Sequence, residues 1–235
     1  MSSVLAAPVP RSNMSLGQKW LGVNVLAQVI CVVTAGAAYG VVRLIGADDP
    51  AAGASLKNVA YGLTIGTELV FAMSVATLRG VVLRQVLPSF PLLLWIGVVI
   101  AYLMSLHFVT GLSPGSNTPV AVRTPTQMSA GLFMLGIGMT AFAGLIMGTI
   151  VGTIEALVIR RASEGAAFWA VMTACAWSAG AVLAFVLGSL VLMKPDLSDT
   201  TIALAGAAAK LAMGAMAGLI TLPALKQLKP RQQAS

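Results

Sequence analysis

The sequence predicts an all-α, polytopic membrane protein with six transmembrane helices. Hydrophobic residues make up 58% of the 235 residues and charged residues only 9%, whereas a soluble domain usually carries about 25% charged residues. The mean hydropathy is +0.92, and the apolar residues fall into six long runs separated by short polar breaks. Because a helix needs about 20 mostly apolar residues to cross a bilayer, each run is long enough to be one span.

The predicted spans follow one another with short connections. The fourth run is longer than a bilayer span requires, so its helix is expected to tilt. They are residues 20–44, 58–83, 91–112, 127–159, 167–193 and 200–225. Residues 1–19 are predicted to form a tail rather than a cleaved signal peptide, because no continuous apolar core precedes Trp20. Residues 226–235 are predicted to form a basic C-terminal tail.

The basic residues predict the orientation of the chain. Of the 14 lysines and arginines, nine lie at or near the ends of the predicted spans on one side of the membrane, four lie at or near the ends on the other side, and Lys210 lies deep within a span. The nine are Arg11, Lys19, Arg79, Arg84, Arg160, Arg161, Lys226, Lys229 and Arg231, and the four are Arg43, Lys57, Arg123 and Lys194. Because an excess of basic residues marks the cytoplasmic side, both termini are expected in the cytoplasm, as in a protein of the bacterial inner membrane. The net charge of +7 therefore indicates a lipid bilayer as the partner, and no nucleic acid.

An internal repeat organises the runs. Trp20, Trp95 and Trp169 open alternate runs at intervals of 75 and 74 residues. The runs between them close on a basic residue, which is Arg84, Arg160 or Lys226. This pattern predicts three helical hairpins in parallel repeat, each opening with a tryptophan at the membrane interface and closing with a basic stop. The alternative is that membrane helices resemble one another only in composition.

Small residues recur at intervals of four or eight positions before the basic stops, which places them along one helix face. They are Gly144, Gly148 and Gly152 in the fourth run, Gly206, Gly214 and Gly218 in the sixth, and Ala72 and Ala76 in the second. Small residues allow membrane helices to approach closely. The second, fourth and sixth helices are therefore expected to meet at these faces.

Glu68 and Lys210 are the charges deepest within the runs. Each precedes its basic stop by sixteen residues, about 24 Å along a helix, so both are expected at the same depth. A lone charge there costs about 3 kcal/mol on insertion scales, which predicts an ion pair between them. The pair can fix how the first and third hairpins dock, or it can serve as a proton or ion relay.

Arg79 and Glu155 form a second possible pair, because each lies five residues before its basic stop and their charges are opposite. Alternatively, both side chains extend toward the lipid headgroups. Cys31 and Cys175 lack a CxxC partner, and His107 is the single histidine. No metal site and no cofactor are therefore expected.

Two functions remain open. Tight packing faces and few polar groups favour a structural or accessory subunit, an assembly partner of a membrane complex or a homo-oligomer. The alternative is a transporter or channel for a small solute or ion that uses Glu68 and Lys210. An enzyme is not expected, because the sequence shows neither a nucleophile with a base nor a metal cluster.

Overall fold

The computed structural model describes residues 14–49, 51–111, 130–192 and 198–231, and these residues are almost entirely helical. The described helices are α1 (Leu16–Leu44), α2 (Ala54–Val86), α3 (Leu92–Gly111), α4 (Ala130–Ile159), α5 (Ala166–Leu192) and α6 (Asp199–Gln227). Two short strands, β1 (Ser163–Glu164) and β2 (Lys229–Pro230), pair in antiparallel fashion. The all-α prediction with six helices is confirmed.

Five of the helices, α1, α2, α4, α5 and α6, are long and apolar enough to cross a membrane. The segment Leu92–Ser105 of α3 is a shorter apolar helix. On α4, Met134, Met139 and Phe142 are each at least 60% exposed. Such large apolar side chains on the outside of a bundle suit lipid better than water.

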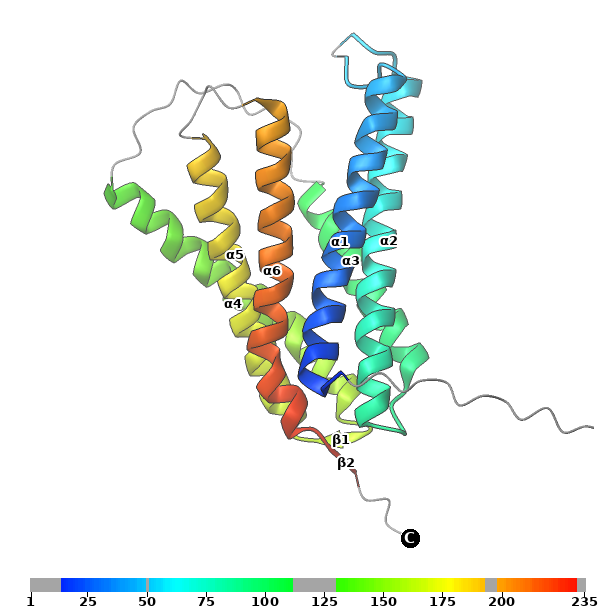
Figure 1. The fold of residues 1–235 in the computed structure, drawn as a ribbon, viewed down its shortest axis with the longest axis vertical. Helices are drawn as coiled ribbons and strands as arrows, with labels where there is room; N and C mark the ends of the chain where they lie inside the picture. The colour runs from blue at the N-terminus through cyan, green and yellow to red at the C-terminus, as the bar shows by residue number, and fades with distance from the viewer. Residues whose placement is uncertain (1–13, 50, 112–129, 193–197, 232–235) are drawn as a thin grey trace, which may run out of the picture.

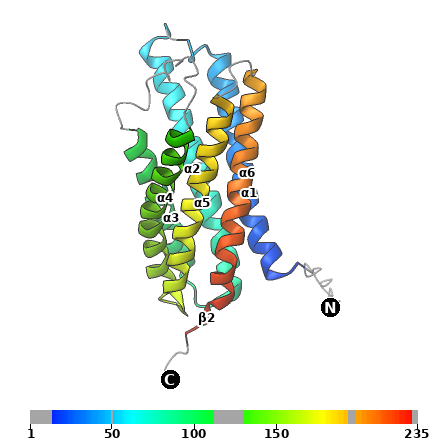
Figure 2. The ribbon, with the colours of Figure 1, turned by 90° about the vertical axis from the view of Figure 1, so that its left-hand side faces the viewer.

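The helices form a ring in chain order. Each helix packs against the next one along the chain, and α6 packs against α1. Figure 1 shows α1, in blue, between α6 and α2. The first turn of α1, the last turn of α6 and both strands lie at one end of the ring, which we call the strand end (Figures 1 and 2).

Local hydrogen bonds extend the structure beyond the predicted spans. Ser15 and Gln18 form a capping box, in which each side chain accepts a hydrogen bond from the backbone N–H of the other. As a result α1 begins at Leu16, within the segment predicted as a tail. At the other terminus α6 continues to Gln227, and β2 follows directly. The end of α6 and the strand β2 thus lie within the segment predicted as a basic C-terminal tail.

The glycine faces pack differently from the prediction. A Cβ atom on Gly148 would lie 2.7 Å from Ala174 Cα of α5, and one on Gly214 would lie 2.8 Å from the Asn24 backbone oxygen of α1. Gly144 and Gly152 likewise contact α5, and Gly218 contacts α1. The expected meeting of the second, fourth and sixth helices at these faces is therefore wrong, because odd-numbered helices alternate with them around the ring.

Gly206 also departs from the expected packing stripe. It is exposed, and a Cβ atom there would meet nothing within 4 Å. The small-residue pattern extends further along α6 than the tight contact with α1 does.

Three tryptophans fill the core at the strand end. Trp20, Trp95 and Trp169 are fully buried. The ring centroid of Trp169 lies 5.5 Å from that of Trp20 and 6.5 Å from that of Trp95, both in edge-to-face geometry. The prediction that these residues mark the membrane interface misses this packing, since each indole N–H finds an acceptor inside the protein.

Candidate functional site

A buried ion pair lies beside the tryptophan cluster. Arg79 Nη1 of α2 lies 3.8 Å from Glu155 Oε1 of α4, and the Glu155 side chain is only 1% exposed. The two charges thus meet across the ring, although α3 separates α2 from α4 in chain order. Burial of an ion pair is costly unless further hydrogen bonds satisfy both groups.

Those further hydrogen bonds reach Glu155 from two other helices. Tyr102 of α3 donates its hydroxyl to Oε1 at 2.8 Å, and Trp169 of α5 donates its indole N–H to Oε2 at 2.8 Å. The Thr173 hydroxyl lies 3.5 Å from Oε2. The carboxylate therefore joins α3, α4 and α5 at a single point.

Arg79 is held by α1. Its Nε and Nη2 atoms donate to Asn24 Oδ1 at 2.9 and 2.6 Å, and its guanidinium carbon lies 5.8 Å from the Trp20 ring centroid. Asn24 Nδ2 in turn donates to the Trp20 backbone oxygen at 2.8 Å. The Trp20 indole donates to Thr221 Oγ1 at 2.9 Å, which adds α6 to the network.

A pocket of about 300 Å³ borders this network inside the ring. Arg79, Tyr102, Thr173 and Thr221 supply polar groups from the network, and Gln28 adds an amide. The remaining wall is largely apolar and comes from α2, α3, α5 and α6. Its residues are Phe71, Val75, Leu103, Ala176, Trp177, Gly180, Ala181, Met213 and Ala217. A concave, mostly apolar site with a few convergent polar groups is typical of small-molecule binding.

The structure does not bring Glu68 and Lys210 together. No ion pair joins them among the described residues; instead, Lys210 Nζ lies 3.3 Å from Cys31 Sγ of α1. Glu68 is partly buried and has no hydrogen bond or ion pair with another described residue. Since α1 packs between α2 and α6, equal depth along two helices does not make these side chains neighbours.

Glu68 and Lys210 nevertheless lie near the pocket. Each precedes a residue that lines it, Phe71 or Met213, by three positions, and residues three apart share a helix face. Both charges are therefore about one turn beyond the pocket, on the side away from the Arg79–Glu155 pair.

The described part of the chain contains no group of three or more His, Cys, Asp or Glu residues that could hold a metal ion. The side chain of His107 lies outside the described residues.

The sequence reasoning missed Tyr102, the three-tryptophan cluster and the role of Thr221. The repeat contains a pattern that points to Thr221. It lies five residues before Lys226, the same repeat position that Arg79 and Glu155 occupy before their basic stops. Tyr102 has no such counterpart in the repeat.

Comparison with known proteins finds no relative: no family model, no curated protein and no solved structure matches this chain.

Proposed function

We propose that this chain is a membrane transporter for a small solute or ion, with its binding site in the central pocket. The observation that carries the proposal is the pocket itself, which lies inside a ring of apolar helices, five of them long enough to cross a membrane, and borders the buried Arg79–Glu155 pair. Ionisable groups buried among membrane-spanning helices are costly and commonly mark substrate or ion pathways. The transport function is thus favoured over the accessory function at this site.

Charges above and below the pocket, along the direction of the helices, support a pathway through the ring. Arg79 and Glu155 lie toward the strand end, and Glu68 and Lys210 lie one turn beyond the opposite side. In this proposal Glu68 and Lys210 act singly along the route rather than as an ion pair. The apolar wall favours a compact solute with one or two polar groups over a fully hydrated ion.

The proposed membrane arrangement has six spans and the strand end in the cytoplasm, as in a bacterial inner-membrane protein. Arg84, Arg160, Arg161 and Lys226 lie beside the helix ends there, which agrees with the excess of basic residues on cytoplasmic sides. The three-hairpin repeat is part of the same proposal. It is supported by equivalent contacts, because Gly152 of α4 meets the residue after Trp169, and Gly218 of α6 meets the residue after Trp20.

A pocket-filling variant tests the transport proposal. Purified protein in detergent is screened for solutes that raise its thermal stability, and flux of each hit, and of protons by a pH-sensitive dye, is measured in proteoliposomes. Ala217→Phe projects a ring into the pocket and is expected to abolish both solute binding and flux. Ala212→Phe, on the exposed side of α6, is the matched control and is expected to retain both. Equal flux in the two variants would exclude the pocket as the route.

A second candidate, an assembly partner of another membrane protein or a homo-oligomer, is favoured by one observation. Gly36 and Gly40 on α1, and Gly62 and Gly66 on α2, have the spacing of close-packing membrane helices, yet a Cβ atom on any of them would meet nothing within 4 Å. Mass spectrometry of complexes from mild detergent tests this function. Loss of a stoichiometric partner or of the oligomer in Gly40→Leu, but not in Gly138→Leu, would favour it.

A further inference from the structure

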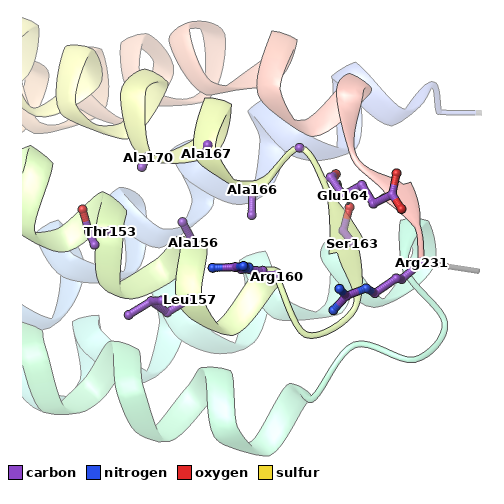
Figure 3. A pocket seen from close by; sticks show the side chains of 11 residues that line it. Thr153, Ala156, Leu157, Arg160, Ser163, Glu164, Ala166, Ala167, Ala170 and Arg231 are labelled. Carbon is purple, nitrogen blue, oxygen red and sulfur yellow. Dashed lines mark hydrogen bonds between the residues drawn. The ribbon is translucent and has the colours of Figure 1, made fainter. Parts of the chain in front are cut away.

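A second pocket, of about 500 Å³, lies at the strand end between α4 and α5 (Figure 3). Thr153, Leu157, Ala167 and Ala170 are among its lining residues, and Arg160 and Arg231 supply two guanidinium groups. Figure 3 shows the side chains running from Thr153 and Ala170 at one end to Arg231 at the opposite end. Arg160 lies between these two ends, beside Ala156 and Leu157, so the pocket combines a largely apolar wall with one guanidinium group midway and a second at the end where the helices stop.

The two arginines are available to a ligand. Both residues are exposed, and neither guanidinium has a hydrogen bond or an ion pair with another described residue. Glu164 also lines the pocket, but Figure 3 shows its carboxylate directed away from the Arg231 guanidinium. The positive charge of Arg231 is thus not neutralised by Glu164, the acidic residue that lines the pocket.

The backbone holds Arg231 in place although it lies near the C-terminus. Its N–H donates to the Ala162 oxygen at 3.0 Å, directly after the pairing of β1 with β2. The buried Ser163 hydroxyl adds a hydrogen bond to the Lys229 oxygen at 2.8 Å. Gly165, at φ +89°, then turns the chain from β1 into α5, a conformation that glycine adopts without strain.

We propose that this pocket binds the phosphate headgroup of an anionic phospholipid. The chain link between α4 and α5 lies where two membrane-length helices end, which is the depth of lipid headgroups. Arginines bind phosphate oxygens in a fixed fork geometry, while the exposed Leu157 and the alanines beside it offer an apolar surface to the glycerol and the upper acyl chains. A basic pocket between membrane helices on the cytoplasmic side is a recognised setting for lipid headgroups. This binding site is independent of the transport proposal.

Native mass spectrometry of the delipidated full chain in a non-ionic detergent tests the site, with phosphatidylglycerol and phosphatidylcholine as probes. One phosphatidylglycerol is expected to bind more tightly than phosphatidylcholine. Arg160→Gln and Arg231→Gln are each expected to weaken it by about fivefold, and the double variant by about 25-fold, since each basic residue near a membrane surface contributes on the order of 1 kcal/mol.

Arg161→Gln is the matched control, because Arg161 is an exposed neighbour of the same charge that does not line the pocket. Its affinity for phosphatidylglycerol is expected to change by less than about twofold, because exposed charges are screened by salt. Equal weakening by Arg161→Gln, or equal binding of the two lipids, would overturn the site. Displacement of the lipid by millimolar inorganic phosphate or glycerol phosphate would overturn the lipid as the occupant and assign a soluble phosphate instead. Thermal unfolding of each variant in the same detergent confirms that all are folded, which is expected for substitutions at exposed positions.

Discussion

Trp169 donates its indole N–H to Glu155 Oε2 at 2.8 Å, and this contact joins the aromatic cluster to the buried charges. Trp169 also packs edge-to-face against both Trp20 and Trp95, while Glu155 accepts from Tyr102 and faces Arg79. One residue pair thus connects the apolar core of the strand end with its polar network.

Trp169→Phe isolates the hydrogen bond from the aromatic packing. The variant keeps a ring in the cluster but removes the donor to a buried carboxylate, so the free energy of unfolding is expected to fall by about 1.5–3 kcal/mol. Reversible unfolding in mixed micelles measures the change. Trp177→Phe is the control, because Trp177 is partly buried and its indole makes no hydrogen bond to a described residue. A loss of the same size in both variants would mean that ring size, and not the hydrogen bond, matters.

Arg79→Met leaves Glu155 as an uncompensated buried charge. Breaking a buried ion pair by removing one partner costs about 3–5 kcal/mol, so a loss of that order is expected in the unfolding free energy. Combining it with Glu155→Gln should recover part of the loss, because the double variant buries neither charge and the glutamine oxygen can still accept from Trp169. A double-mutant cycle measures the coupling; strictly additive losses would show that the two charges do not interact.

Gly148→Ala tests the contact between α4 and α5. The added Cβ atom would lie 2.7 Å from Ala174 Cα, and backbone cannot yield as a flexible side chain does, so a loss of about 1–3 kcal/mol is expected. Gly138→Ala on the same helix meets nothing within 4 Å and should be neutral or slightly stabilising, because alanine favours helix. If thermal stability in detergent is unchanged for Gly148→Ala, the packing of α4 on α5 is looser than described.

Reporter fusions test the proposed orientation. Fusions after Arg84, Arg161 and Ser235 are expected to give a cytoplasmic signal, and fusions at Pro50, Gly115 and Pro195 the opposite signal, following the distribution of basic residues. A phosphatase active only outside the cytoplasm and a fluorescent protein that folds only inside it give complementary readouts. A cytoplasmic signal at Gly115 would contradict the six-span arrangement.

The sequence predicts the number of helices, but not the order of the helices around the ring. Hydropathy predicts six spans because a bilayer span has a fixed length; six helices are found, and five of them are long and apolar enough to cross a membrane. Repeat position brings Arg79 and Glu155 to one depth, and they meet. Glu68 and Lys210 also share a depth but do not meet, because rotation about the ring axis is set by neighbouring helices and α1 lies between theirs.

The tryptophan cluster could not be predicted for a related reason. A tryptophan at the start of a membrane span is typical of the interface, where its ring faces lipid and its N–H faces water. At Trp20, Trp95 and Trp169 the acceptors come instead from Thr221, the Ala76 backbone and Glu155. For Trp95 on α3 and Trp169 on α5 the acceptor lies on the helix just before, α2 or α4, whereas for Trp20 on α1 it lies on α6, far along the chain.

That long-range hydrogen bond sets an order for biogenesis. Trp20 and Thr221 are 201 residues apart, so their hydrogen bond cannot form until both α1 and α6 have been synthesised. Asn24 and Arg79 can meet as soon as α2 enters, and Glu155 meets Trp169 once α5 follows. The contact of Gly214 and Gly218 with α1 therefore joins the first described helix to the last one, and it can form only after every other described helix has been synthesised.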